Sequence, residues 1–488
     1  MQQQSLKDKT VSGVGWSAAD AFLGQGVMFL VGLVLARLLS PSEYGLIGIV
    51  SIFVVVLNGI VDSGFSNALI RKTNTTNDDY NTMFITNMVI SIVLYFVLFF
   101  SAPAIAYFFE RTELTYLVRA MGVIVIIQAL SLTQVTILTK RIDFKTKAKA
   151  SVSSAIISGI VGITMAFMGY GVWSLVGQQV SNKIVYTVCL WILNRWWPTF
   201  SFNKESFNYM WGFGWKLMVS GLLNNVWGQL YRVVVGKFYN PATLGQYTRA
   251  GEYSNLLSSN FTSIIQRVSY PALAQVQDDK VRMVAAYRKV IKTTMFVTCV
   301  SMLFMASVSE PLIYCLIGPQ WHIAATFLPF ICIAQSLYPL HAINLNMLQV
   351  QGRSDIFLIL EIVKKILGLG PLVVGIFVGI YWMLVASFIY GVISFLLNSY
   401  YSGRVLNYSS WMQIKDVVPS YGMGLIIAIS VFFFKYLSIS YFIILPIQII
   451  VGAGVFFFLC EKTKMEEYIE LKGIAMQYIT KIKRHKNR

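Results

Sequence analysis

Long apolar stretches alternate with short polar connections along this 488-residue chain. Each stretch is close to the roughly 20 residues that an α-helix needs to cross the hydrocarbon core of a bilayer. The pattern therefore predicts an all-α integral membrane protein with about fourteen transmembrane helices. They are expected near residues 11–38, 42–69, 81–108, 114–138, 149–168, 172–193, 208–236, 244–270, 290–317, 322–349, 356–379, 381–403, 417–437 and 440–460.

The first six predicted helices resemble the next six. Matched positions about two hundred residues apart lie where helices start and stop: Pro41 and Pro241, Gly45 and Gly245, and Asp78-Asp79 and Asp278-Asp279. An even number of helices per repeat gives both copies the same orientation, as in the parallel repeats of some transporters. We predict two lobes around a cavity, then two more helices and a basic amphipathic tail on the inner leaflet, with bounds of 1–200, 201–408, 409–460 and 461–488.

Composition excludes an ordinary soluble protein, because 56% of the residues are hydrophobic and 12% are charged. The net charge of +18 would suggest a nucleic-acid partner in a soluble protein. Of the 39 Lys and Arg, however, four lie in odd-numbered connections, eight inside predicted helices, and the other 27 in the tails and even-numbered connections. By the positive-inside rule, this asymmetry places both termini in the cytoplasm and explains the charge without a nucleic acid.

Charged residues inside membrane helices are costly, at about 2.5–3.5 kcal/mol each on insertion scales, so they mark candidate functional positions. The cations within predicted helices are Arg119, Lys183, Lys216, Arg232, Arg249, Arg267, Lys364 and Lys365. The anions are Asp20, Asp62, Glu252 and Glu361. The excess of cations favours an anionic ligand, or water, in a cavity between the lobes.

Each of these candidates also has a structural interpretation. Arg249 and Glu252 are three residues apart, so they form either an intrahelical ion pair or part of a binding site. The same alternatives hold for Lys364, which follows Glu361. Lys216 and Arg232 lie near opposite ends of one predicted helix and are further candidates for the cavity. Asp62 and Asp20 lie in small-residue segments that suit either close helix packing or a coupling site for H⁺ or Na⁺.

Enzyme and cofactor motifs are scarce. The sequence contains no glycine-rich phosphate loop, no nucleophile elbow and no metal triad, and its five cysteines lack the spacing of metal ligands. We therefore predict no catalytic residue, no cofactor and no metal. Helix capping accounts for the two Asp-Asp pairs.

Three segments carry a family resemblance. Residues 35–45, 140–144 and 171–176 resemble the Wzx-type bacterial polysaccharide flippases of the multidrug, oligosaccharidyl-lipid and polysaccharide exporter superfamily, with the colanic-acid exporter branch nearest. Residues 247–252 and 62–68 are similar to two motifs of the lipid II flippases, with Asp62 where those proteins have Glu. That likeness implies that Arg249 binds a lipid diphosphate and that Glu252 lines the same cavity. Gln25 and Val31 stand at about the places of two cavity arginines of that family.

The resemblance implies a flippase of the bacterial inner membrane that works by alternating access. Its substrate would be an undecaprenyl-diphosphate-linked oligosaccharide, carried to the outer leaflet for O-antigen, capsule or exopolysaccharide synthesis. Arg249 is the expected phosphate ligand, with Lys216, Arg232 and Lys364 as further candidates. The expected partners are the lipid bilayer, H⁺ or Na⁺, and the polysaccharide polymerase machinery.

Two other functions remain open at this stage. A multidrug–cation antiporter on the same fold would be expected to bind its drugs with buried carboxylates, and the excess of cations argues against it. A membrane-embedded O-antigen polymerase or ligase would be expected to carry a sizeable outer loop, and the predicted outer connections are short.

Overall fold

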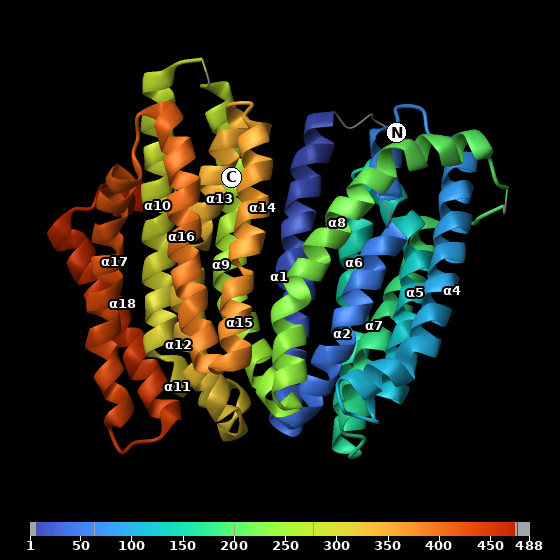
Figure 1. Ribbon diagram of the computed structural model, residues 1–488, viewed down its shortest axis with the longest axis horizontal. Coiled ribbons are helices and arrows are strands. Elements are labelled where there is room, and N and C mark those ends of the chain that lie inside the picture. Colours follow the sequence, from blue (N-terminus) through green and yellow to red (C-terminus); the bar gives the residue numbers. More distant parts are fainter. Residues whose placement is uncertain (1–5, 63, 200, 277, 474–475, 477–488) are drawn as a thin grey trace, which may run out of the picture. The chain divides into compact units, whose positions relative to one another are not determined.

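The computed structural model of the chain describes residues 6–62, 64–199, 201–276, 278–473 and 476 (Figure 1). Within these ranges, the side chains of residues 6–14, 17–22, 260, 263–272, 354 and 405 lie outside the description. The described backbone is almost wholly helical and contains no strand. The predicted all-α fold is thereby confirmed.

The chain divides into two compact units, residues 1–245 and 246–488. The first unit holds the start of α9 and the helices α1 (Leu6–Leu38), α2 (Pro41–Asp62), α3 (Phe65–Arg71), α4 (Asn77–Phe108), α5 (Leu114–Lys140), α6 (Phe144–Phe167), α7 (Val172–Asn194) and α8 (Lys204–Phe238). The bounds of α9 are Pro241–Gln275. The lobes at 1–200 and 201–408 stay a prediction. They were inferred from a sequence repeat, whereas the compact units are defined by contacts in the structure.

The second unit holds most of α9 and ten helices besides two short 3₁₀ turns, Pro319–Trp321 and Phe433–Tyr436. These are α10 (Lys280–Ser307), α11 (Ser309–Ile317), α12 (His322–Gln335), α13 (Tyr338–Val350), α14 (Ser354–Leu367), α15 (Leu369–Phe377), α16 (Ile380–Leu406), α17 (Ser410–Phe432) and α18 (Tyr441–Thr463), with a last helical stretch over residues 466–473.

Nine helical segments of the described chain are long and apolar enough to cross a membrane. They are Pro41–Arg71, Asn77–Phe108, Leu114–Lys140, Phe144–Phe167, Lys280–Ser307, Pro319–Val350, Ile380–Arg404, Ser410–Tyr436 and Tyr441–Thr463. The predicted total of fourteen stays a prediction. The long helices α8 and α9 are outside this group because they are more polar, and they carry four of the predicted site residues.

The repeated Asp-Asp pairs begin helices in both units. Thr76 and Asp79 form a reciprocal cap at the start of α4, in which the Asp79 carboxylate accepts from the Thr76 amide at 2.9 Å. Asp279 caps α10, and its Oδ1 accepts from the amides of Val281 and Arg282 at 3.1 Å each. Such caps satisfy amides that the first turn of a helix leaves without partners. The predicted capping role is confirmed for Asp79 and Asp279, the second member of each pair.

The repeated prolines and glycines meet one another within the first compact unit. Helices α2 and α9 begin at Pro41 and Pro241, where the ring fixes a helical φ and no amide hydrogen is needed. A Cβ atom at Gly45 would overlap the carbonyl of Pro241, and one at Gly245 would overlap the carbonyl of Pro41. Both positions therefore require glycine, because the two helix starts cross at backbone contact.

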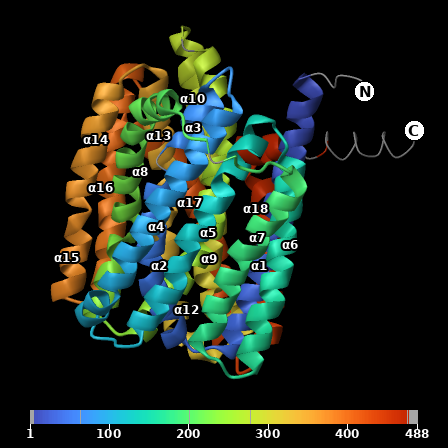
Figure 2. The ribbon, with the colours of Figure 1, turned by 90° about the vertical axis from the view of Figure 1, so that its right-hand side faces the viewer.

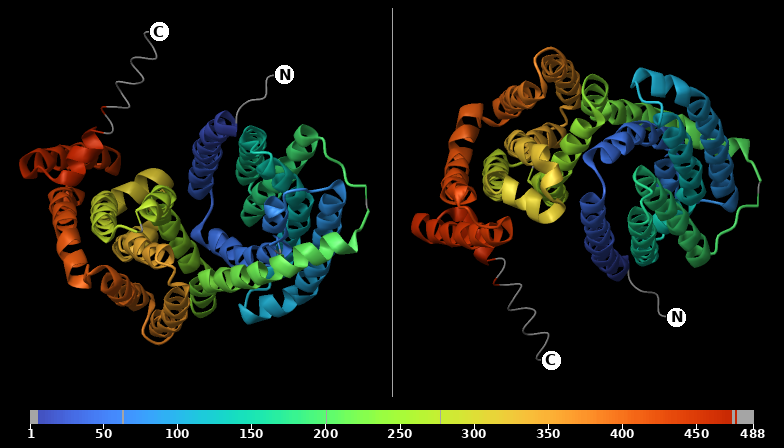
Figure 3. Two further views of the ribbon diagram at one scale, coloured as in Figure 1. Left: turned by 90° about the horizontal axis from the view of Figure 1, so that it is seen from above. Right: turned by 90° about the horizontal axis from the view of Figure 1, so that it is seen from below.

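Each unit has its own apolar core. In the first unit, Val61, Phe65, Met83 and Val125 pack together with Met210 of α8. Helix α1 lies beside α6, and α6 beside α7 (Figures 2 and 3). In the second unit, α10, α13, α16 and α17 form a cluster of buried residues: Met283, Tyr287, Ile291, Met295, Cys299, Leu340, Ile343, Met347, Phe395, Leu406, Tyr408 and Val417.

The chain after α18 returns to α10 through ion pairs. Lys292 lies 3.0 Å from Glu466 and 3.1 Å from Glu467, and Lys289 lies 2.6 Å from Glu470. The acidic residues of this segment thus face the basic start of α10. The predicted membrane contact of the tail stays a prediction, and residues 477–488 lie outside the described residues.

Candidate functional site

Helix α9 presents the predicted phosphate ligand in its third turn. Arg249 Nη1 donates to Glu252 Oε2 at 2.7 Å, so the intrahelical ion pair expected from the spacing is present. The arginine side chain is 14% exposed and the glutamate side chain is 49% exposed. Because one partner is half exposed, the pair itself stabilises the helix by only a few tenths of a kcal/mol, about 0.2–0.5. A contribution this small does not explain why a cation is largely buried here.

Helix α14 carries a second pair of the same spacing with the order of charges reversed. Lys364 Nζ donates to Glu361 Oε1, and the lysine is almost fully buried. The Nδ1 atom of His341 is buried and has no hydrogen-bond partner within the described part of the chain. Lys364 is therefore a buried cation whose partner is a carboxylate of its own helix.

Helix α8 separates the two cations predicted on it. Arg232 lies seven residues after Asn225 and four before Gly236, and a Cβ at Gly59 of α2 would overlap the Asn225 amide. This spacing puts Arg232 on the face of α8 that contacts α2. It is half-buried and donates to Gln229 at 3.2 Å. Lys216 falls on the opposite face and is exposed.

Asp62 is the last residue of α2 and is half-buried. Its Oδ1 accepts from the hydroxyl of Ser66 at 2.8 Å across the break between α2 and α3. Gly64 lies in this break with a φ of 69°, and a Cβ added there would meet the Gly214 carbonyl of α8 at 2.7 Å. The small-residue packing and the carboxylate expected from the sequence thus occur together. The side chain of Asp20, the other coupling candidate, lies outside the described residues.

Two of the cations predicted inside helices have neutral partners. Arg119 donates to the Phe99 carbonyl at 3.3 Å and lies 4.2 Å from the centre of the Phe99 ring. Lys183 donates to Gln128 Oε1 at 3.1 Å. Among the described side chains, no carboxylate forms an ion pair with either of these two cations, with Lys216 or with Arg232. Carboxylates therefore neutralise only part of the excess positive charge.

Among the predicted site residues, the structure brings Arg249 into contact with Glu252. Lys364 contacts its own partner on α14, and Lys216 and Arg232 lie on different faces of one helix. In the part of the chain that the structure describes, no group of His, Cys, Asp or Glu has the arrangement of a metal site. What the arrangement offers chemically is binding of an anion by guanidinium and ammonium groups.

Sequence reasoning missed a polar network in the second unit. Arg288 of α10 binds Asp416 of α17 through two hydrogen bonds of 2.5 and 2.6 Å, and Asp416 also accepts from Tyr408 at 2.6 Å. Next to it, the buried hydroxyl of Tyr287 donates to Asn344 at 2.7 Å. The partners are far apart in the sequence, and no periodic pattern marks them.

The sequence model of the family described as "Polysaccharide biosynthesis protein" matches residues 34–326. This range contains Asp62, Lys216, Arg232 and Arg249 but not Lys364. The chain is 25% identical to the succinoglycan biosynthesis transport protein ExoT of Rhizobium meliloti, over 68% of each protein. It is 21% identical to the lipopolysaccharide biosynthesis protein WzxC of Escherichia coli, over 76% of each.

A solved structure resembles this fold along most of the chain. It is the lipid II flippase MurJ in an inward closed conformation, with a TM-score of 0.73 and 16% sequence identity. The match covers 92% of this chain and 98% of that structure. At this identity the likeness concerns the fold, and it agrees with a multi-pass membrane protein.

Proposed function

The chain belongs to the polysaccharide biosynthesis protein family, and on that premise we propose that it is a flippase for lipid-linked oligosaccharides. It moves undecaprenyl-diphosphate-linked repeat units from the cytoplasmic to the outer leaflet of the bacterial inner membrane. The observation that carries the proposal is the combination of a polysaccharide-biosynthesis family with the fold of a lipid flippase. Flipping forms and breaks no covalent bond, so the function needs no catalytic residue or cofactor.

Arg249 is the proposed ligand of the diphosphate. A guanidinium binds phosphate oxygens through two parallel charge-assisted hydrogen bonds, which an ammonium cannot reproduce. Glu252, at 2.7 Å from Nη1, holds the guanidinium in place and balances its charge while no substrate is bound. Because Glu252 is half exposed, an incoming diphosphate can replace it without burying a free carboxylate.

Arg232 and Lys364 are the next candidates, since both are at least half-buried and each donates to a polar side chain of its own helix. Lys216 is exposed on the opposite face of α8 from Arg232 and stays a further candidate. Asp62 is proposed as a coupling site for H⁺ or Na⁺, because its carboxylate has a neutral hydroxyl partner and no cation among the contacts described. Asp20 stays a second candidate for coupling.

The paired carboxylates favour this function over a multidrug–cation antiporter. An antiporter needs buried carboxylates that can accept a cationic drug. Here Glu252 and Glu361 are each bound to a cation of their own helix. The excess of cations fits an anionic lipid headgroup instead.

Depletion of the protein in a strain without other flippases tests the proposal. We expect lipid-linked repeat units to accumulate in the inner leaflet, where an impermeant sugar-oxidising reagent added to spheroplasts cannot reach them, and surface polysaccharide to disappear. Normal reagent access to the repeat units after depletion would rule the function out. An unchanged repeat-unit pool together with lost drug resistance would assign the chain to the antiporters.

Orientation is part of the proposal. Both termini are placed in the cytoplasm, with the lobes at 1–200 and 201–408 in the same orientation. Single cysteines at Lys145 and Ala285 should react with a membrane-impermeant reagent only from inside, and cysteines at Arg111, Asn240 and Ser438 only from outside. Labelling of Lys145 and Asn240 from the same side would contradict the arrangement.

A further inference from the structure

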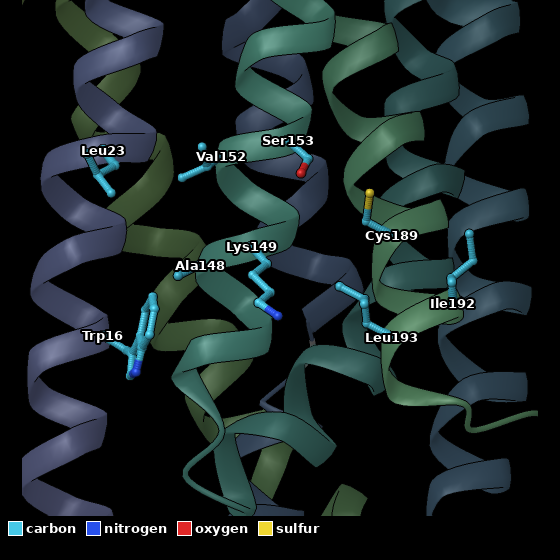
Figure 4. Close-up of a pocket in the computed structure, with 9 residues that line it drawn as sticks. All are labelled: Trp16, Leu23, Ala148, Lys149, Val152, Ser153, Cys189, Ile192 and Leu193. Carbon is cyan, nitrogen blue, oxygen red and sulfur yellow. The ribbon is translucent and has the colours of Figure 1, made fainter.

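An apolar groove lies among α1, α6 and α7 of the first unit (Figure 4). Its volume is about 480 Å³. The lining residues are Trp16, Leu23, Ala148, Lys149, Val152, Ser153, Cys189, Ile192 and Leu193. Leu23, Ile192 and Leu193 are exposed along it. The groove is thus mainly apolar, and Lys149 is the single cation among its lining residues.

That cation, Lys149, lies in the second turn of α6 and forms no ion pair among the side chains that are described. Lys145 precedes it by one helical turn, and its Nζ lies 5.5 Å from the centre of the Trp16 ring. Like charges four residues apart on one helix repel each other. A bound anion between the two ammonium groups would remove this repulsion, so the geometry favours a negatively charged occupant.

The combination of groove, indole and ammonium groups matches one class of molecule. Trp16 can lie at the level of lipid headgroups, where tryptophan is enriched, and lysine ammonium groups extend toward the same level. The cation distribution predicts that residues 140–149 face the cytoplasm, where the leaflet is rich in anionic lipids. We propose that this groove binds one anionic phospholipid of the inner leaflet, with an acyl chain along Leu23 and Ile192 and its phosphate at Lys149.

The size of the groove favours a phospholipid chain over the long isoprenoid carrier of a sugar. Its volume lies within the range of about 300–1,000 Å³ that is typical of sites for small ligands. One acyl chain of a phospholipid matches a space of this size, whereas a long isoprenoid chain would leave most of its length outside the groove. The lining residues of the groove belong to α1, α6 and α7, so the proposed lipid site shares no residue with the proposed phosphate site on α9 and does not depend on the flippase function.

One rival explanation concerns Asp20. Its position, four residues after Trp16 and three before Leu23, puts it on the same face of α1 as the groove, and its side chain lies outside the described residues. An ion pair between Asp20 and Lys149 would give the lysine a structural role. The test therefore includes a variant at each position.

The test uses the full-length protein in detergent, with native mass spectrometry of bound phosphatidylglycerol and phosphatidylcholine. We expect Lys149→Gln to weaken phosphatidylglycerol binding about fivefold, or about 1 kcal/mol, and to leave phosphatidylcholine binding unchanged. Lys147→Gln is the matched control, because Lys147 belongs to the same basic segment but donates to Thr139 at 3.3 Å. Ser153→Phe, which fills the groove, should lower the binding of both lipids.

Several results would overturn the proposal. Equal retention of phosphatidylglycerol by Lys149→Gln and wild type would do so, as would equal binding of the two lipids by wild type. Recovery of a polyprenyl phosphate as the resident lipid would assign the groove to a different molecule. A Lys149→Gln protein with lower thermal stability, normal lipid binding and rescue by Asp20→Asn would assign Lys149 to the ion pair.

Discussion

The helices α2 and α9 start in the same way and then diverge. Two hundred residues separate equivalent positions, so Ile49 corresponds to Arg249 and Ile52 to Glu252. Ile49 is 0% exposed and Ile52 is 4% exposed, whereas Arg249 and Glu252 form an ion pair with a half-exposed carboxylate. The same turns of a repeated helix thus carry an apolar packing surface in one copy and a charged site in the other.

This difference shows which positions of the two helices are constrained by packing and which are free to differ in polarity. Pro41, Gly45, Pro241 and Gly245 recur because the two helix starts cross at backbone contact, where no side chain fits. One turn later that constraint ends, and the copies differ in polarity. A charged pair that replaces an apolar pair in a membrane helix lowers stability, and this cost is one reason why we propose a function for the pair in α9.

Exchange of the divergent positions should give the largest effect. Ile49→Arg with Ile52→Glu places charges on a fully packed surface, at about 2.5–3.5 kcal/mol per charge on insertion scales. We expect this variant to be absent from membranes. The reverse variant, Arg249→Ile with Glu252→Ile, should accumulate normally and lose transport. Immunoblots and surface polysaccharide measure both outcomes, and normal accumulation of the first variant would show that the comparison is wrong.

A methyl group at the crossing should give the next largest effect. Gly45→Ala forces a Cβ atom into the Pro241 carbonyl, and overpacking of this kind costs about 1–3 kcal/mol. Thermal unfolding of the purified protein, followed by size-exclusion chromatography, measures the loss. Gly251→Ala is the control in α9, because a Cβ there meets no atom within 4 Å. Equal stability of the two variants would mean that the glycines do not hold the crossing together.

A salt bridge between the end of α8 and the turn after α4 should give the smallest effect. Lys237 Nζ donates to Glu110 Oε1 at 2.7 Å, and this hydrogen bond holds the pKa of Glu110 below its ordinary value of 4.5. A lowered carboxyl pKa stabilises the fold above pH 4.5, and this contribution is lost as the pH falls through the lowered pKa. Glu110→Gln should therefore unfold slightly earlier than wild type at pH 7, because exposed pairs contribute little.

The same pair of proteins provides the control at low pH. The difference in melting temperature should shrink as the pH falls from 4.5 through the lowered pKa of Glu110, where the carboxyl of the folded wild-type protein also becomes neutral. A difference that stays constant over this range would mean that the loss comes from side-chain packing rather than from the charge of Glu110.

The sequence was sufficient for the fold class and the family, because both depend on patterns along the chain. Apolar periodicity predicted the helices, and segments such as 35–45 predicted the family; both are confirmed. The spacing of Arg249 and Glu252 left an ion pair and a binding role open, and the ion pair is present. The count of fourteen spans stays a prediction, because nine helical segments of the described chain have the length and hydropathy of a span, and α8 and α9 are not among them.

Contacts between distant segments could not be predicted. The Arg288–Asp416 pair joins helices that are far apart in the sequence, and neither residue lies in a recognisable motif. The crossing of Gly45 and Gly245 was missed for a similar reason: the repeat showed that the positions correspond but not that they touch. The sequence also did not show which side of α8 each cation occupies. Arg232 lies on the face that contacts α2, whereas Lys216 is exposed on the opposite face.

The most direct test of the account is flipping by the purified protein in proteoliposomes. A lipid-linked oligosaccharide with a labelled sugar is placed in the inner leaflet, and its arrival outside is followed with an impermeant glycosidase. We predict that Arg249→Ala abolishes transfer, that Arg249→Lys retains part of it, and that Glu252→Ala keeps more than Arg249→Ala because the phosphate ligand remains. Transfer at the wild-type rate by Arg249→Ala, or rescue in the double variant with Glu252→Ala, would contradict the account.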